Sequence, residues 1–147
     1  MPIKLEETYF KTFILEQTDK KYGSEGEPTT VTIKQATQSE HEQRNQMFAT
    51  LERRFSDANP GEMSFVQTAN TEELKRIEVW LSLCDCNILD SNGKPLFQSK
   101  KSKGGQPSLN MTKQQFAEAW GLLPPDVATE IHNKVIEVNF MWGPSGG

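Results

Sequence analysis

Helix-start signals are the feature that most constrains the fold of this chain. Thr37-Gln38-Ser39-Glu40 fits a capping box, in which the threonine hydroxyl accepts an orphan amide and the glutamate side chain reaches back. Thr112-Lys113-Gln114-Gln115 repeats the pattern. Leu122-Leu123-Pro124-Pro125-Asp126 places proline in the first turn of a further helix, where its missing amide is tolerated. These signals predict helices after residues 37, 112 and 124.

Apolar residues at helical spacing follow each of these signals. Asn59-Pro60-Gly61 ends the first helical region, and Gly121 ends the helix that starts at Thr112. The stripes that mark a buried face are Met47, Phe48, Leu51 and Phe55, then Phe116 and Trp120, and finally Ala128, Ile131, Val135 and Val138.

The segment between residues 70 and 88 fits two patterns. Asn70 or Thr71 is a suitable N-cap, and Glu72-Glu73 would lie at the positive end of a helix. The length and the cap favour a helix, although part of the run also alternates as a strand would. The helical face comprises Leu74, Ile77, Leu81, Cys84 and Ile88, and the alternating residues are Ile77, Val79, Leu81 and Leu83.

The N-terminal region has strand composition instead. Residues 9–15 and 30–34 are rich in aromatic and β-branched residues, and the polar stretch 18–30 predicts a long loop between two strands. The sequence therefore predicts one mainly α domain over residues 1–147, with about four helices packed as a small bundle and a short N-terminal β-hairpin. Residues 1–36 form the strand region, 37–142 the helical region with a mobile loop near 98–110, and 143–147 a flexible tail.

Charge and hydropathy exclude several classes of function. The net charge is −4 and the pI about 5.3, which argues against nucleic-acid binding. The loop Lys100-Lys101-Ser102-Lys103 has no interleaved aromatic residues, so solvated lysines explain it. No window approaches the roughly 20 apolar residues of a membrane span. The N-terminus has no apolar signal core, and two cysteines are too few for a secreted disulfide scaffold.

Cys84-Asp85-Cys86, together with His41 and His132, offers the residue types of a zinc site or a thiol nucleophile. The two cysteines are too close in sequence for a structural zinc site, and on a helix they would point about 200° apart. Asp85 also disfavours a thiolate. We therefore expect no metal, no cofactor and no enzymatic activity.

Aromatic and methionine side chains point instead to protein binding. Phe140-Met141-Trp142 follows the last helix, where it would either stay exposed for a partner or pack back onto the domain. A groove for an amphipathic helix would use Phe48, Leu51, Leu81, Phe116, Trp120, Ile131 and Val135, which would equally suit a bundle core. The predicted partner-binding residues are Phe116, Trp120, Leu123, Ile131, Val135, Phe140, Met141 and Trp142.

Two ordered segments carry a family resemblance. The C-terminal third reads Phe116-Ala117-Glu118-Ala119-Trp120-Gly121-Leu122-Leu123-Pro124-Pro125, then Ile136-Glu137-Val138-Asn139. Upstream, Thr30-Val31-Thr32-Ile33-Lys34-Gln35-Ala36-Thr37 precedes Glu40. Over about residues 28–142 this arrangement resembles the tail assembly chaperones of long-tailed bacteriophages. The first 27 residues have no counterpart in that pattern.

The resemblance implies a specific role. Such chaperones bind the long, helical and apolar tape measure protein in the host cell cytoplasm and keep it soluble before the tail tube polymerises. The tail tube protein is a further expected partner, and self-association is left open. Many such chaperones are made in two lengths by a ribosomal frameshift. Two alternatives remain: a virion structural protein, such as a head–tail adaptor or tail component, and a small enzyme centred on Cys84 or a carboxylate.

Overall fold

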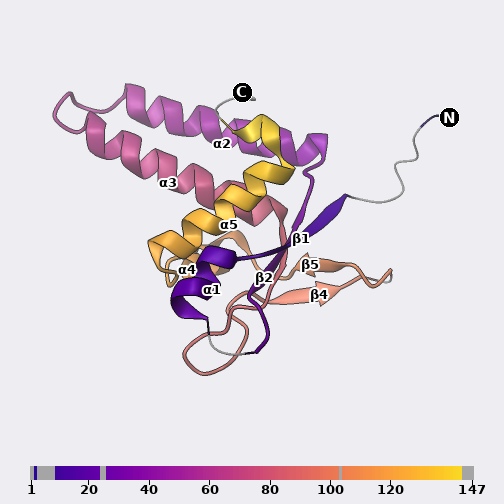
Figure 1. The fold of residues 1–147 in the computed structure, drawn as a ribbon. Coiled ribbons are helices and arrows are strands. Elements are labelled where there is room, and N and C mark those ends of the chain that lie inside the picture. Colours follow the sequence, from indigo (N-terminus) through magenta and orange to yellow (C-terminus); the bar gives the residue numbers. More distant parts are fainter. Residues whose placement is uncertain (1, 3–8, 24–25, 103, 144–147) are drawn as a thin grey trace.

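A computed structural model describes residues 2, 9–23, 26–102 and 104–143 (Figure 1). The chain mixes strands and helices, with three consecutive strands between two pairs of consecutive α-helices. They are β1 (Phe10–Ile14), α1 (Glu16–Tyr22), β2 (Thr30–Lys34), α2 (Gln38–Ser56), α3 (Met63–Ser82), β3 (Leu83–Cys86), β4 (Ser99–Lys101), β5 (Pro107–Leu109), α4 (Lys113–Trp120), α5 (Pro125–Val138) and the 3₁₀ helix η1 (Phe140–Trp142).

The prediction of a mainly α four-helix bundle is wrong, because the described chain forms a mixed α/β fold. The strands β1, β2 and β3 form an antiparallel sheet with β2 in the centre, and β4 pairs with β5 in a second small sheet. The decisive segment is β3, where Cys86 lies opposite Val31 of β2. The predicted N-terminal hairpin is present, since β1 pairs directly with β2.

Local capping signals located the helix starts correctly. Thr37 Oγ1 accepts a hydrogen bond from the Glu40 amide at 3.2 Å, and the Thr37 amide donates to Glu40 Oε1 at 3.0 Å. Thr112 and Gln115 form the same reciprocal pair at the start of α4. Pro125 occupies the first turn of α5, as predicted. These caps work because they satisfy backbone amides within four residues and need no tertiary contact.

The second predicted helix was wrong at both ends. The helix α3 begins at Met63, so Asn70 lies inside it, and the Asn70 side-chain Nδ2 donates to the Leu51 carbonyl oxygen across the hairpin at 2.6 Å. It ends at Ser82 because Leu83 adopts extended backbone angles and the following residues pair with β2. The strand alternative therefore holds only for 83–86.

Two segments predicted as loops contain regular structure. The helix α1 (Glu16–Tyr22) overlaps the start of the polar stretch 18–30, and the Glu130 carboxylate of α5 caps it by accepting bonds from the Gln17 and Thr18 amides at 3.0 and 2.8 Å. The Thr18 hydroxyl donates to the same carboxylate at 2.7 Å. This cap comes from a distant helix and leaves no local signal. The segment predicted as a mobile loop near 98–110 holds the β4–β5 hairpin. Of the predicted tail 143–147, only Gly143 is among the described residues.

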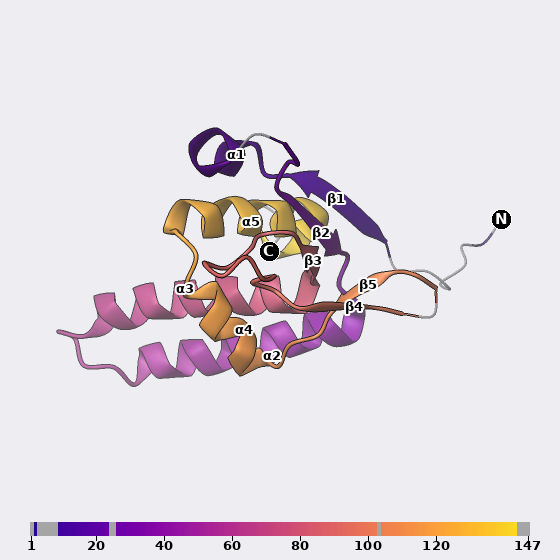
Figure 2. The ribbon, with the colours of Figure 1, turned by 90° about the horizontal axis from the view of Figure 1, so that it is seen from below.

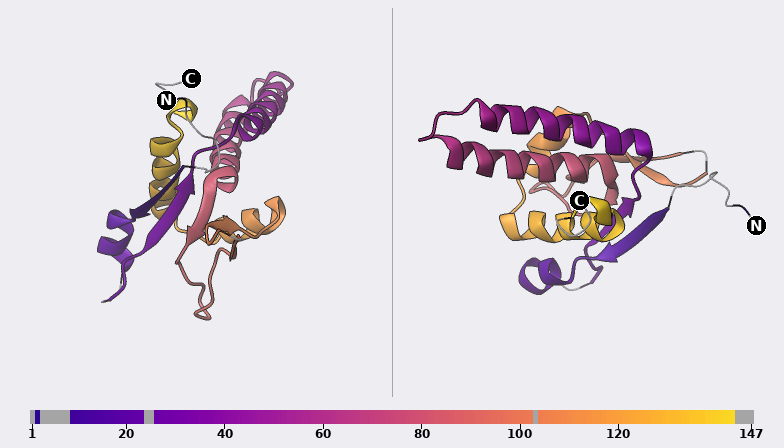
Figure 3. Two further views of the ribbon diagram at one scale, coloured as in Figure 1. Left: turned by 90° about the vertical axis from the view of Figure 1, so that its right-hand side faces the viewer. Right: turned by 90° about the horizontal axis from the view of Figure 1, so that it is seen from above.

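One apolar core joins the sheet to the helices. Figures 2 and 3 show α5 running alongside α3, with α2 on the far side of α3. The helix α5 packs against β2, and α4 packs against α3. The largest side chains that are almost fully buried in this core are Phe97, Phe116, Leu15, Ile33, Leu83 and Ile131.

A buried carboxylate connects three helices. Glu78 of α3 is 2% exposed, and its Oε2 accepts hydrogen bonds from Arg44 of α2 at 3.0 and 3.1 Å. Its Oε1 lies 2.7 Å from Nε2 of His132 on α5. A carboxylate with so little exposure needs such partners, because the charge loses its hydration on burial. The cluster therefore sets the relative positions of α2, α3 and α5.

We expect Glu78→Ala to lower the free energy of unfolding by about 3–5 kcal/mol, because it leaves the Arg44 guanidinium, whose side chain is only 16% exposed, without its partner. Urea denaturation followed by circular dichroism measures the change. Glu72→Ala is the matched control, since Glu72 is an exposed carboxylate on the same helix and pairs with Lys75 at only 3.7 Å. That control should change stability by less than about 1 kcal/mol. Equal effects of the two variants would contradict the structural role of Glu78.

Glu130 gives a pH-dependent prediction. Partial burial raises its pKa, but the bonds from the Gln17 and Thr18 amides and the Thr18 hydroxyl outweigh burial, so the pKa lies below its usual value. The unfolded chain therefore takes up this proton first. The stabilisation is complete above the ordinary glutamate pKa of about 4.3 and is lost as the pH falls through the lower folded-state value. We expect Glu130→Gln to make the free energy of unfolding fall less steeply below about pH 4.3. Profiles of unfolding free energy against pH that coincide for the variant and the unaltered protein would refute this.

Candidate partner-binding site

The helices α2 and α3 form an antiparallel hairpin that reaches beyond the other helices (Figures 1 and 3). We call this hairpin the arm. The 19 residues of α2 correspond to a length of about 28 Å. The helix α2 packs mainly against α3, whereas α3 also contacts α4 and α5. The outer part of the arm is thus held by contacts between its own two helices.

An apolar groove runs between the two helices of the arm, and we call it the arm groove. Its cavity measures about 300 Å³. Leu51 is 2% exposed and forms its floor, while Phe48 on its wall is 40% exposed. Among the described residues it is lined from α2 by Phe48, Leu51, Glu52 and Phe55, and from α3 by Gln67, Asn70, Thr71 and Leu74.

Two arginines near the arm groove, Arg44 and Arg54, are paired with glutamates of α3. Arg54 of α2 and Glu73 of α3 form an ion pair of 2.9 Å. The Arg44 guanidinium lies 5.6 Å from the centre of the Phe48 ring while its nitrogens bond Glu78. Phe65, near the start of α3, is 80% exposed and adds a large apolar side chain to the arm. The arm therefore combines exposed apolar side chains with paired arginines, and Glu52 adds a carboxylate to the groove lining.

The structure places most of the predicted partner-binding residues in the core. Phe116, Ile131 and Val135 are fully buried. The Phe116 ring lies 5.5 Å from that of Phe97 and 5.7 Å from that of Trp120, centre to centre. Trp120 and Leu123 are half-buried and pack against the same core. In this conformation these residues support the fold and leave little surface for a partner.

The C-terminal segment is divided between exposure and burial. Phe140 is 67% exposed and Met141 is 54% exposed, whereas Trp142 is only 6% exposed. Trp142 Nε1 donates a hydrogen bond of 2.9 Å to Nδ1 of His41, which anchors η1 to the start of α2. The Asn139 side chain accepts from the Ala36 amide and donates to the Lys34 carbonyl oxygen. Phe140 and Met141 are thus held on a fixed base and face solvent.

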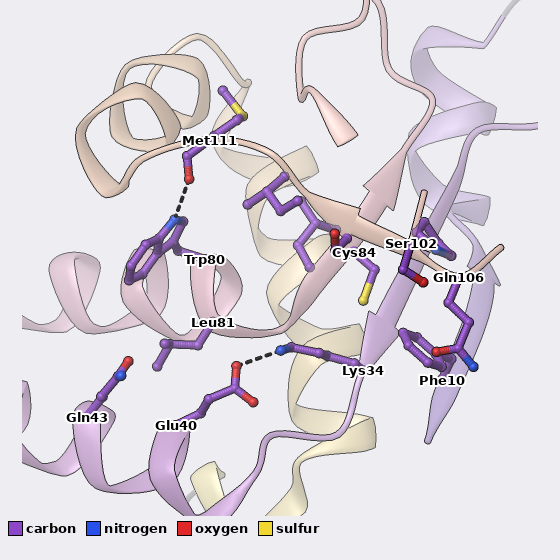
Figure 4. Close-up of a pocket in the computed structure, with 14 residues that line it drawn as sticks. Phe10, Lys34, Glu40, Gln43, Trp80, Leu81, Cys84, Ser102, Gln106 and Met111 are labelled. Carbon is purple, nitrogen blue, oxygen red and sulfur yellow. Dashed lines mark hydrogen bonds and ion pairs between the residues drawn. The ribbon is translucent and has the colours of Figure 1, made fainter. Parts of the chain in front are cut away.

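A cavity of about 430 Å³ lies between β3, β5 and the start of α2 (Figure 4). Figure 4 shows Lys34 and Glu40 in contact at the lining of this cavity, and their ion pair measures 2.6 Å. Trp80 Nε1 donates to the Met111 carbonyl oxygen at 3.3 Å on the opposite side. Because the two charges neutralise each other, the cavity holds no free charge of its own from this pair.

The cysteines lie on β3 and not on a helix, which corrects the geometry expected for them. Both are buried, and burial raises the pKa of the Cys84 thiol to about 11 and that of Cys86 to about 12. Both histidines have other partners, Glu78 and Trp142. Within the described ranges, no group of three His, Cys, Asp or Glu side chains is placed to hold a metal ion. No described helix has the length and apolar character needed to cross a bilayer.

Comparisons with protein families, curated proteins and solved structures gave no match for this chain.

The sequence did indicate one wall of the arm groove, since Phe48, Leu51 and Phe55 belong to the predicted stripe of the first helix. It missed the facing wall because the start of α3 was placed seven residues too late, at Asn70 in place of Met63. Met63, Val66 and Asn70 stand at helical spacing and could have extended the helix backwards.

The division of the C-terminal segment can be tested by truncating its two aromatic residues separately. We expect Trp142→Ala to lower the free energy of unfolding by about 3–5 kcal/mol, because a buried aromatic ring and its bond to His41 are lost. Phe140→Ala, the matched control on the same segment, should change it by no more than about 0.5 kcal/mol. Urea denaturation followed by circular dichroism compares them, and a larger effect of Phe140→Ala would reverse the assignment.

Proposed function

We propose that this protein is a phage tail assembly chaperone that binds an amphipathic helical segment of the tape measure protein in the arm groove. The observation that carries the proposal is an open apolar groove lined, among the described residues, only by the two helices of the arm. A groove between two helices is a common receptor for a third, amphipathic helix. The work of such a chaperone would take place in the host cell cytoplasm.

The geometry of the arm suits a helical ligand. An amphipathic helix presents apolar side chains at every third or fourth position along one face. The arm groove offers Phe48 and Phe55, two turns apart on α2, with Leu74 facing them from α3. A segment lying there would bury its apolar stripe and keep its polar face in water. Covering that stripe removes the surface through which a long apolar helix aggregates.

The family resemblance supports the same role by a separate route. The segments that carry it build the framework which holds the arm. Phe116 and Trp120 pack in the core beside α3. Asn139 ties the end of α5 to the connection between β2 and α2. A family signature made of framework residues would preserve the fold while the arm groove adapts to its own partner.

Co-expression with the tape measure protein of the same phage tests the proposal. The protein should raise the soluble fraction of the tape measure protein and co-purify with it. Phe48→Glu should reduce co-purification by about tenfold or more, because it places a charge in an apolar contact. Leu122→Glu is the matched control, since Leu122 is 73% exposed and lies outside the arm.

Circular dichroism should show that both variants remain folded, because the two replaced side chains are exposed. Loss of binding in Leu122→Glu alone, or full binding by Phe48→Glu, would exclude the arm groove as the site. Failure of the unaltered protein to solubilise or retain the tape measure protein would exclude the chaperone role. Finding the protein in purified particles would favour a virion structural protein.

A further inference from the structure

The outer edge of β1 is an unpaired strand edge. Two backbone bonds flank the ladder between β1 and β2: the Gln35 amide donates to the Tyr9 carbonyl oxygen, and the Leu15 amide donates to that of Thr29, both at 2.9 Å. Inward and outward backbone groups alternate along an antiparallel strand. The amides and carbonyls of Phe10, Thr12 and Ile14 therefore point away from β2.

This edge lacks two of the usual devices that prevent strand pairing, a proline and a β-bulge. Among the described residues, no strand pairs with the outer side of β1. The strand Phe10–Ile14 contains no proline, and its ladder with β2 continues without a bulge. Its only charge, Lys11, is directed elsewhere, with Nζ 3.8 Å from the Glu137 carboxylate of α5 and 4.9 Å from the Phe13 ring centre. The backbone edge is therefore open to another strand.

We propose that two copies of this protein associate through β1, whose outer edges pair antiparallel about a two-fold axis at Thr12. In this register Phe10 of one copy lies opposite Ile14 of the other, and every outward amide and carbonyl from Phe10 to Ile14 finds a partner. The two three-stranded sheets become one continuous sheet. We choose a second copy as the partner of this edge because the outward groups of Phe10, Thr12 and Ile14 are arranged symmetrically about Thr12 and so complement themselves.

Repulsion between the two Lys11 side chains favours one register for the paired β1 strands. With the axis at Thr12, Lys11 of each copy lies opposite Phe13 of the other, so the two lysines stand on the diagonal and not directly opposite each other. Shifting the axis to Lys11 would place the two lysines directly opposite each other, which disfavours pairing. Shifting it to Phe13 would leave Phe10 without a partner strand. The Thr12 register is thus the longest one that separates the two positive charges.

The side chains around the edge agree with this pairing. Ile14 is 49% exposed, and Thr12 lies on the surface with its hydroxyl 2.9 Å from that of Thr32. Pairing would bring Ile14 beside Phe10 of the second copy and would cover apolar surface of both side chains that is exposed to solvent in the single copy. The arm lies on the other side of α5, so both arm grooves would remain available in the dimer (Figure 3).

Sedimentation velocity of the full chain at several protein concentrations tests the proposal. The unaltered protein should form dimers as the concentration rises. Thr12→Pro should remain monomeric, because proline removes the central outward amide and cannot donate to a second strand. Thr12→Val is the matched control, since it loses the same hydroxyl bond to Thr32 but keeps the amide, and it should dimerise like the unaltered protein.

A disulfide test fixes the register and does not depend on the proline variant folding. Under a mild oxidant, Thr12→Cys should give a covalent dimer, because paired residues at the axis have Cα atoms about 5.5 Å apart. Lys11→Cys should not, since its two copies would be about 7–8 Å apart on the diagonal. The natural cysteines, 1% and 3% exposed, should not cross-link. A monomer at all concentrations, a dimer that survives Thr12→Pro, or cross-linking at residue 11 and not 12 would overturn the proposal.

Discussion

The arrangement of the helices depends on the buried carboxylate of Glu78. It binds Arg44 through one oxygen and His132 through the other, so that α2, α3 and α5 meet at a single group. Arg44 and Glu78 both belong to the arm, so their ion pair holds α2 against α3, while the contact of Glu78 with His132 ties the arm to α5. Apolar packing alone is tolerant of small sliding motions, whereas a desolvated ion pair requires particular distances.

The sheet region and the arm differ in which apolar side chains they bury and which they expose. The sheet, α4, α5 and the C-terminal half of α3 bury most of the large apolar side chains. The arm carries Phe48 and Phe65 at the surface, and the C-terminal turn carries Phe140 and Met141. Exposed aromatic and methionine side chains on a rigid base favour contact with another protein, because they add apolar contact area with little ordering of the base. The proposed chaperone role and the proposed edge pairing use different surfaces of the protein.

Several elements could be predicted because their causes are local. Thr37 and Thr112 cap helices through residues three positions away, and the β-branched residues of β2 favour an extended chain. The fold class was not predictable in this way. Leu83–Cys86 follows a helix and has apolar residues that fit either structure, and it becomes a strand because the edge of β2 is there to receive it. Only one wall of the candidate site could be predicted, for a similar reason. The α2 wall of the arm groove belongs to a helix with a local cap, whereas the α3 wall does not.

The sequence by itself determined where three helices begin, where two strands lie, and that apolar aromatic residues gather in the C-terminal third. Only the tertiary structure decided which of those aromatic residues are covered. Phe116 and Trp142 are buried and Phe140 is exposed, although all three have similar hydrophobicity. The physical reason is that hydrophobicity favours burial of all of them equally. The number of buried positions is set by the neighbouring elements, here α5, η1 and the start of α2.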